Sequence, residues 1–402
     1  MVWRFFLNIF NLPDTIFHHI QQFNKLNVID NPRAFWVVNS LFVFALSVFC
    51  AGVLIPQILL ISFRKRLFDV PDERKIHQGV VPRLGGIAFK PVVFFSVALA
   101  LGLNMLLGYG QLLGNIGSES RPLAFGFCTI MMLYLVGMAD DLIGIRYRAK
   151  FAIQIICGLL VIAGGLWINN LHGLLFIHAL PEWIGYPITL FAVVFIINAI
   201  NLIDGIDGLA SGLCGVAMLF YGLVFFIIGE YIYALLAFAT LGVLVPFFYY
   251  NVFGDPAKKN KIFMGDTGSL TIGMMTCILS LKLLDGFPVN PSMQQPNAFF
   301  LAYSPLIIPC FDVVRVYLHR VRNGKNPFLP DKNHIHHKML AVGMRQRTVM
   351  IAIVLVSVCF TLCNILLSRY INVTLLLILD IFIWTLGNLW LTRRIHIVHS
   401  KL

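Results

Sequence analysis

The sequence is poor in charged residues. Only 12% of its 402 residues are Asp, Glu, Lys or Arg, about half the share that is typical of soluble domains. Hydrophobic residues make up 59% of the chain and the mean hydropathy is +0.84. This composition excludes an ordinary soluble domain and indicates an integral membrane protein.

The sequence also lacks several patterns that would point to other classes of protein. Its eight cysteines all lie inside apolar runs, with neither metal-ligand spacing nor the pattern of a disulfide framework. There is no internal repeat and no low-complexity linker. Residues 1–36 lack the continuous apolar core of a signal peptide, so we expect an extracytoplasmic or interfacial segment there. One membrane domain over 37–392 and a cytoplasmic tail over 393–402 are expected to follow.

Long apolar runs are abundant. Lipid offers the backbone no water to bond, so such runs are expected to be helices. The runs that are long enough to span a membrane are 37–62, 84–107, 122–139, 151–169, 186–203, 209–228, 232–250, 269–284, 299–318, 347–368 and 371–392. The predicted fold class is all-α, a polytopic transmembrane helical bundle with about eleven spans.

The charges are distributed unevenly between the two sides of this bundle. Most Lys and Arg residues fall in the loops after odd-numbered runs and in the tail, which predicts that these loops and the C-terminus are cytoplasmic and the N-terminus is outside. Topology and anionic lipid or phosphate substrates explain the net charge of +12 better than nucleic acid does. Most acidic residues also gather near the cytoplasmic side, which topology does not require.

A pair of carboxylates stands at the cytoplasmic end of the third run, in GMADDLIGIRYRAK. Asp140 and Asp141 are adjacent there, and Lys150 follows a short distance on. Adjacent carboxylates at a membrane boundary are costly unless a cation or water compensates them. The pair suits Mg²⁺ binding, general-base chemistry or both; the alternative is a solvated loop edge.

A polar stripe ends the fifth run, in NAINLIDGIDGLASG. Asn198, Asn201, Asp204 and Asp207 recur every three residues, a spacing that keeps them on one face of a helix. The glycines after each aspartate break the helix. The stripe favours a lined cavity over its alternative, an Asn/Asp/Gly turn.

A glycine-rich segment, FMGDTGSL, leads into the eighth run. Glycines permit close approach of the backbone, and the N-terminus of the following helix offers N–H groups to an anion. Asp266 suits a Mg²⁺ held jointly by protein and phosphate. A helix N-cap made by Asp266 or Thr267 is the alternative, and both descriptions can hold together.

Two basic segments complete the set of motifs. Lys75, His77 and Arg83 precede the second run with a glycine pair, and they suit a lipid or nucleotide phosphate. In NPFLPDKNHIHHKML, a cluster of histidines lies in the longest cytoplasmic loop. No cysteine or spaced carboxylate completes a zinc set, so we favour phosphate binding or support of the site over a solvated basic loop. The clustered histidines are His334, His336 and His337.

A few charged residues inside apolar runs belong to no motif. Lys90 and Asp380 lie within runs, where a charge is usually functional. Asp312 and Arg315 are three residues apart, and we expect them to pair with each other.

In this order, the five segments resemble the polyprenyl-phosphate N-acetylhexosamine-1-phosphate transferase superfamily, glycosyltransferase family 4. The resemblance covers about residues 60–345 and depends on the combination of ADD, NLIDGIDGL, FMGDTGS and HIHH. The HIHH motif is more similar to the undecaprenyl-phosphate GlcNAc-1-phosphate transferase branch than to the muramoyl-pentapeptide branch, which tends to have consecutive histidines.

The resemblance implies an active site on the cytoplasmic face of the inner membrane and a Mg²⁺ or Mn²⁺ cofactor. It implies transfer of HexNAc-1-phosphate, GlcNAc-1-phosphate above all, from a UDP-sugar to polyprenyl (undecaprenyl) phosphate in the first membrane step of a cell-envelope glycan pathway. The products are polyprenyl-diphosphate-HexNAc and UMP. Residues and resemblance together assign catalysis to Asp140, Asp141, Lys150, Asp204 and Asp207, metal binding to Asp141, Asp204 and Asp266, and substrate binding to Lys75, His77, Arg83, Asn201, Phe263, His334, His336 and His337.

Some alternatives stay open at this point. A secondary transporter of an anionic solute is the rival class, although transporters place charges near the membrane midplane and often in two related halves. The sequence does not distinguish direct attack from a double displacement, or a monomer from a homodimer.

Overall fold

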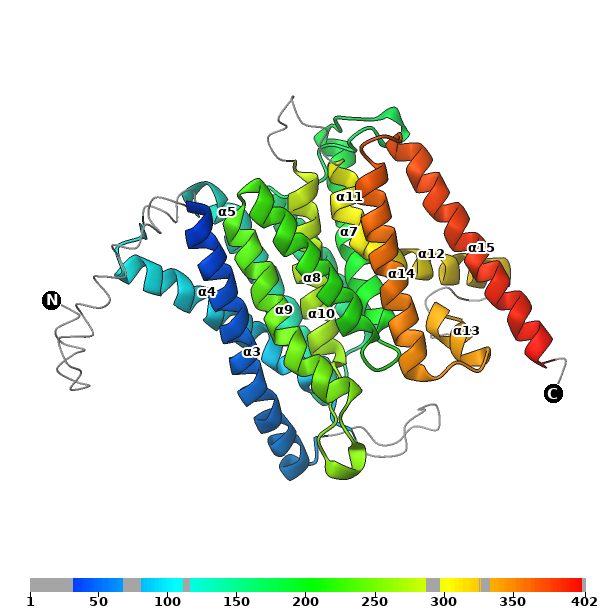
Figure 1. Cartoon of the computed structure of the whole chain (residues 1–402), viewed down its shortest axis with the longest axis horizontal. Coiled ribbons are helices and arrows are strands. Elements are labelled where there is room, and N and C mark those ends of the chain that lie inside the picture. Colours follow the sequence, from blue (N-terminus) through cyan, green and yellow to red (C-terminus); the bar gives the residue numbers. More distant parts are fainter. Residues whose placement is uncertain are drawn as a thin grey trace.

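The computed structural model describes residues 32–67, 81–110, 116–286, 297–324, 326 and 333–399. These ranges are largely helical, and no strand forms in them beyond one antiparallel bridge between Asn170 and Ala179 (Figure 1). The α-helices are α3 (Pro32–Lys65), α4 (Phe89–Leu106), α5 (Ile116–Ile143), α6 (Tyr147–Ala163), α7 (Glu182–Ile203), α8 (Leu209–Ile228), α9 (Tyr231–Val252), α10 (Gly265–Leu284), α11 (Ala298–Tyr303), α12 (Ile307–Arg322), α13 (Ile335–Ala341), α14 (Gln346–Leu367) and α15 (Val373–His399). Short 3₁₀ turns are η1 (Gly85–Ala88), η3 (Leu174–Phe176), η4 (Pro256–Lys258) and η5 (Ser304–Leu306).

The predicted membrane bundle is confirmed. Among the described residues, 10 helical segments are long and apolar enough to cross a membrane. The remaining predicted run, the fourth, corresponds to α6, whose 17 residues lie at the short end of the length that a span needs. The side on which each terminus lies stays a prediction.

Two predicted runs differ in detail from the structure. The ninth run, 299–318, forms two helices rather than one, because α11 gives way to the 3₁₀ turn at Ser304–Leu306 before α12 begins. Pro305 lies in that turn, where its missing N–H interrupts helical bonding, and Figure 1 shows α12 lying crosswise to α14. The fourth run was expected to reach residue 169, but α6 ends at Ala163, before Gly164 and Gly165.

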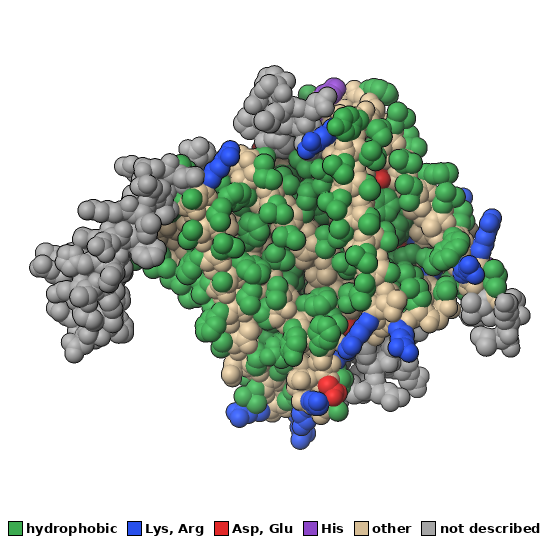
Figure 2. All heavy atoms as spheres, viewed as in Figure 1, with side chains coloured by type: hydrophobic (Ala, Val, Ile, Leu, Met, Phe, Trp, Pro, Cys, Tyr) green, Lys and Arg blue, Asp and Glu red, His purple; other side chains and the backbone are tan. Residues whose placement is uncertain are grey.

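The surface matches a bundle that is surrounded by lipid. Figure 2 shows apolar side chains covering the middle of one face, with Lys and Arg gathered toward its edges. Large apolar side chains such as Leu366, Phe382 and Trp390 are more than half exposed. Exposed hydrophobic surface of this extent is suited to hydrocarbon rather than to water.

Helix α10 forms the centre of the bundle, and nearly all of its residues are buried. Small residues let neighbouring helices approach it closely: Gly273 lies against Ile197 of α7, and Gly137 of α5 lies against Thr267. Several buried hydroxyls on α10 are satisfied within the helix, as when Thr276 Oγ1 donates to the Ile272 carbonyl at 2.7 Å. This packing holds the first turn of α10 beside the end of α5.

A buried ion-pair cluster joins the helices at the other end of α10. Lys282 Nζ lies 3.0 Å from both carboxylate oxygens of Glu119 on α5, and it also lies over the ring of Tyr233 on α9. The Tyr233 hydroxyl donates to Glu119 Oε2 at 2.7 Å. The Lys282 side chain is only 8% exposed, so this cluster ties three helices together away from water.

Candidate active site

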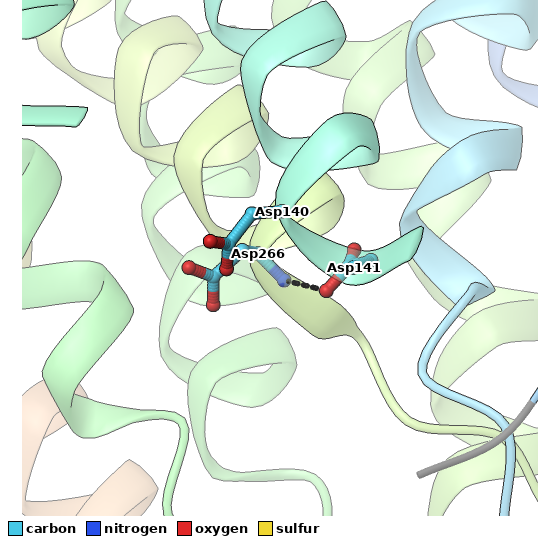
Figure 3. Close-up of side chains that lie close together, drawn as sticks. All are labelled: Asp140, Asp141 and Asp266. Carbon is cyan, nitrogen blue, oxygen red and sulfur yellow. Dashed lines mark hydrogen bonds between the residues drawn. The ribbon is translucent and has the colours of Figure 1, made fainter. Parts of the chain in front are cut away.

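Three carboxylates meet where α5 ends and α10 begins. Asp140 and Asp141 lie in the last turn of α5, and Asp266 lies in the first turn of α10 (Figure 3). One ligand oxygen from each lies within 4.8 Å of the others. In octahedral Mg²⁺ sites, ligands at 2.0–2.1 Å from the ion are at most about 4.2 Å apart. A small contraction would therefore bring one oxygen of each carboxylate within reach of a single ion.

Lys150 bridges two of these carboxylates. Its Nζ lies 2.7 Å from Asp266 Oδ2 and 3.1 Å from Asp140 Oδ2. Asp140 Oδ1 also accepts the Ile145 backbone N–H at 2.7 Å, which fixes the turn into α6. The ammonium of Lys150 thus lies where the carboxylates attract a cation, in contact with Asp140 and Asp266.

Asp141 has a further contact that the sequence did not indicate. Its oxygens accept the backbone N–H groups of Asp266 and Thr267, both at 2.8 Å, and the Thr267 hydroxyl at 2.5 Å; Figure 3 shows the bond to Asp266. No side chain at the N-cap position of α10 caps that helix. The alternative left open by the sequence, a local cap by Asp266 or Thr267, does not form, because a carboxylate from α5 fills that role. Asp140 and Asp266 keep more oxygen lone pairs available than Asp141 does.

Glycine at position 265 permits this contact. Gly265 has φ +70°, and a Cβ atom there would collide with the Arg83 carbonyl and lie 2.5 Å from Asp141 Oδ2. Gly144 has the same φ of +70°, yet nothing lies within 4 Å of its added Cβ. An alanine would be held in the same unfavourable left-handed conformation at both positions, but its Cβ would collide with neighbouring atoms only at position 265.

We expect Gly265→Ala to cost much more stability and activity than Gly144→Ala. The left-handed conformation alone costs roughly 1–2 kcal/mol for Ala, and only the first variant also forces Asp141 away from α10. Thermal unfolding and turnover of the two variants measure the difference. Equal losses in both would show that the crowding at Gly265 is unimportant.

The polar stripe at the end of α7 divides into two parts. Asn201 Nδ2 donates to Asp266 Oδ1 at 3.2 Å and to Ser269 Oγ at 2.8 Å, so it faces the carboxylates as predicted. Asn198 instead bonds to Gln154 on α6 at 2.6 Å. Asn198 therefore contacts α6, one turn of helix before Asn201, and whether it lines the same cavity stays a prediction.

Asp204 lies just beyond the end of α7 and is coupled to the cluster. Burial, followed by the charges of Asp266 and Asp207, raises the pKa of Asp204 to about 7, and Arg83 opposes the shift. The folded pKa exceeds the ordinary value of 3.8, so folding favours the protonated form. The associated stability is full at acidic pH and is lost as the pH rises through 7.

This shift predicts a pH dependence of stability in the metal-free protein. With EDTA present, the melting temperature should fall as the pH rises from 5 to 8, and Asp204→Asn should flatten that fall. Thermal scans of both proteins in the same detergent give the comparison. An identical slope in the variant would exclude Asp204 as its source.

Asp207 is paired with a lysine that the sequence did not single out. Lys261 Nζ lies 2.5 Å from Asp207 Oδ2, and it also lies 6.0 Å from the centre of the Phe263 ring. Lys261 is 8% exposed. The pair therefore fixes Asp207 and Phe263 relative to each other, and no spacing rule in the sequence would have joined them.

The basic segment before α4 lies against the glycine-rich segment before α10. The backbone N–H groups of Gly85 and Gly86 donate to the carbonyls of Phe263 and Met264, both at 3.0 Å. An added Cβ at Gly86 would collide with Gly268, so the absence of a side chain at Gly86 permits this close contact between the two segments. Arg83 thereby lies near Asp204. Lys75 and His77 lie outside the described residues.

The histidine motif is held by α12. His334 Nδ1 lies 2.8 Å from Asp312 Oδ2, and Asp312 Oδ1 accepts from Arg315 at 2.8 Å and from the Ile335 N–H at 2.9 Å. The expected pairing of Asp312 with Arg315 is confirmed, but Asp312 also fixes His334. Its charge inside an apolar run was the available signal for this role.

His336 connects this motif to the loop after α7, which carries Asp204 and Asp207. Its ring stacks on that of His334 at 5.7 Å between centroids and packs against Gly205. Burial, followed by the neighbouring His337, lowers the pKa of His336 to about 3. Both ring nitrogens of His336 are buried without a hydrogen-bond partner among the described residues. A neutral imidazole with unpaired nitrogens is suited to a ligand.

The fold and these contacts define a polytopic membrane protein with an acidic, cation-attracting site at one end of its bundle. The family model "Glycosyl transferase family 4" matches residues 123–284. The chain is 30% identical to the undecaprenyl-phosphate alpha-N-acetylglucosaminyl 1-phosphate transferase of Yersinia pestis, over 77% of this chain and 79% of the relative.

Two further relatives give the same result. Identity is 30% to a probable undecaprenyl-phosphate N-acetylglucosaminyl 1-phosphate transferase of Bacillus subtilis, over 84% of this chain and 88% of the relative. It is 31% to the Escherichia coli K12 undecaprenyl-phosphate alpha-N-acetylglucosaminyl 1-phosphate transferase, over 72% and 74%. The chain belongs to glycosyl transferase family 4, and it is therefore a transferase rather than the transporter that the sequence left open.

Proposed function

We propose that this protein transfers an N-acetylhexosamine-1-phosphate, GlcNAc-1-phosphate in the first instance, from a UDP-sugar to polyprenyl phosphate at the cytoplasmic face of the inner membrane. The meeting of Asp140, Asp141 and Asp266 around Lys150 is the observation that supports this most strongly. The names of the relatives agree with it.

In the proposed reaction, an oxygen of the lipid phosphate bonds to the sugar-bearing β-phosphorus of the donor. The bond from that phosphorus to the oxygen bridging to the α-phosphate breaks, and UMP leaves. Such a transfer needs alignment and neutralisation of negative charge more than covalent help. A site of carboxylates, an ammonium and imidazoles at the membrane edge is suited to both needs.

The carboxylate set fits a hard divalent cation. Asp140 and Asp266 would hold Mg²⁺ or Mn²⁺, with Asp141 and Asp204 close by. When bound, the ion would neutralise charge on the donor diphosphate and on the departing UMP. The position of the Lys150 ammonium between Asp140 and Asp266 supports this assignment, because that ammonium already satisfies the same attraction.

The remaining residues act on the substrates directly. With a cation held by Asp140 and Asp266, Lys150 would be available to bind the transferred phosphate. The unpaired nitrogens of His336 bond phosphate or sugar oxygens next to Gly205. Phe263, fixed by Lys261 and Asp207, offers a flat face to the nucleobase.

The test is release of UMP by purified protein in detergent with Mg²⁺, undecaprenyl phosphate and a panel of UDP-HexNAc donors. We expect UMP only when acceptor and metal are both present, with UDP-GlcNAc or another single donor preferred. Omission of acceptor and addition of EDTA are the controls. Absence of UMP with every donor would refute the proposed function.

A further inference from the structure

A short hairpin joins α6 to α7 at the end of the bundle that lies away from the aspartate cluster. The N–H of Leu171 donates to the His178 carbonyl at 2.8 Å, and the N–H of Leu180 donates to the Asn169 carbonyl at 2.7 Å. The 3₁₀ turn η3 forms the tip of the hairpin. Figure 1 shows this connection at the top of the view, beside the start of α15.

The base of the hairpin is bonded to the ends of two membrane helices. Asn169 Nδ2 donates to Asp285 Oδ1 at 2.9 Å, and His172 Nε2 lies 2.8 Å from the Leu284 carbonyl, both where α10 ends. Asn297, at the N-cap of α11, donates to the His172 carbonyl at 2.8 Å. Since the apolar segments of α10 and α11 end and begin at these residues, the hairpin lies at the plane where the spans leave the hydrocarbon.

The tip of the hairpin lies at the same depth, beside α15. The Leu175 N–H donates to Thr374 Oγ1 at 2.7 Å, and Thr374 is the second residue of α15. Leu174 packs against a buried cluster that includes Phe300 and Val373. Only 22% of the most apolar part of α15 is buried within the protein, so the tip borders a surface that faces lipid.

Apolar side chains project outward from this tip. Leu175 is 63% exposed, Phe176 is 80% exposed and Ile177 is 41% exposed. The backbone is left-handed at Leu175 and Phe176, with φ +52° and +62°, a conformation that is costly for residues other than glycine. Such strain persists only where the surrounding structure holds it, and it often marks a functional position. Apolar side chains held outward in water contribute nothing to folding, so a partner for the tip is expected.

Two other exposed aromatic side chains lie at the same end of the bundle. Trp183 is the second residue of α7, and Tyr370 lies between α14 and α15; each is 76% exposed. Tyrosine and tryptophan gather where a membrane protein meets the lipid headgroups. The lipid-facing surface is therefore continuous from the starts of α7 and α15 onto the tip of the hairpin.

We propose that Leu175, Phe176 and Ile177 insert into the headgroup region of the leaflet opposite to the aspartate cluster, and that the hairpin thereby fixes the depth of α10 in the membrane. Apolar side chains bury to this depth where a segment lies in the interface. The 20 residues of α10 extend about 30 Å, which matches the hydrocarbon core of a bilayer. Holding the last turn of α10 at one interface therefore places Asp266, in its first turn, at the other.

The test replaces Phe176 by 4-trifluoromethyl-phenylalanine in the full chain, reconstituted in phospholipid nanodiscs. The ¹⁹F relaxation is measured with dissolved oxygen, which concentrates in hydrocarbon, and with a nickel chelate, which stays in water. We expect the ratio of the oxygen effect to the chelate effect at position 176 to be several-fold higher than for the same probe at Lys258, in the exposed turn η4. It should approach the ratio at Phe382, a lipid-facing position of α15. A ratio at position 176 equal to that at Lys258 would overturn the proposal, because the tip would then face water.

A second set of variants tests what holds the tip at this depth. Thr374→Val keeps the shape of the side chain but removes the hydroxyl that accepts the Leu175 N–H, so it should lower the ratio at position 176, whereas Thr374→Ser should preserve it. Thr385→Val is the matched control, because the Thr385 hydroxyl bonds only to the Ile381 carbonyl within α15. An unchanged ratio in Thr374→Val would contradict the assigned role of the hairpin's contact with α15. These measurements use no substrate, so they stand or fall independently of UMP release.

Discussion

Asp266→Asn should reduce turnover by about 10²–10³-fold, the loss typical of removing one electrostatic group from an active site. The amide keeps the shape of the side chain but neither neutralises Lys150 nor binds a hard cation as a carboxylate does. The backbone N–H of residue 266 still bonds to Asp141, so α10 keeps its cap. UMP release under saturating substrates measures the effect.

Asp255→Asn is the matched control for this variant. Asp255 lies in the loop that precedes α10 and caps the short turn η4 through the Ala257 N–H, a bond that Asn also accepts. The control should turn over normally, and both variants should express and unfold like the wild type. Normal turnover in Asp266→Asn would remove Asp266 from the proposed chemistry.

Lys282→Met should lower the free energy of unfolding by roughly 1–3 kcal/mol, because it leaves the carboxylate of Glu119, whose side chain is only 19% exposed, without its closest cation. The change affects stability rather than the chemical step, since Lys282 lies at the opposite end of α10 from Asp266. Thermal unfolding in detergent should show a large fall in the melting temperature, while surviving protein should keep its KM values.

A double variant distinguishes the stability lost with the ion pair from the stability lost with the packing of the Lys282 side chain. Lys282→Met combined with Glu119→Leu removes the closest ion pair, and replacing such a pair by apolar residues is often neutral. Glu230, which lies 4.0 Å from Lys282, remains, but its side chain is 35% exposed and stays in contact with water. We expect the double variant to recover much of the lost stability. A double variant as unstable as the single one would mean that packing around Lys282, and not its charge, carries the effect.

The sequence predicted the membrane bundle well because apolar runs of sufficient length have few alternatives in lipid. It did not predict the break at Ser304–Leu306, since a proline inside a span is often tolerated and its effect depends on neighbouring helices. The early end of α6 at Ala163 was indicated by the glycine pair that follows, but apolar residues beyond it obscured that signal.

The sequence predicted which residues gather at the site. It did not predict which of them contact one another. Asp140, Asp204 and Asp266 each stand at the end of an apolar run, so topology alone brings them to one side of the membrane. The cap of α10 by Asp141 and the support of His334 by Asp312 join segments far apart in the chain. Such contacts follow from helix packing, which no local spacing encodes.

Binding of Mn²⁺, followed by electron paramagnetic resonance of the free ion, tests the central claim most directly. We predict that the wild type and Asp255→Asn remove Mn²⁺ from solution, and that Asp266→Asn and Asp140→Asn lose most of that affinity. Undiminished Mn²⁺ binding in both active-site variants would contradict the claim that carboxylates from the end of α5 and the start of α10 jointly hold the divalent cation.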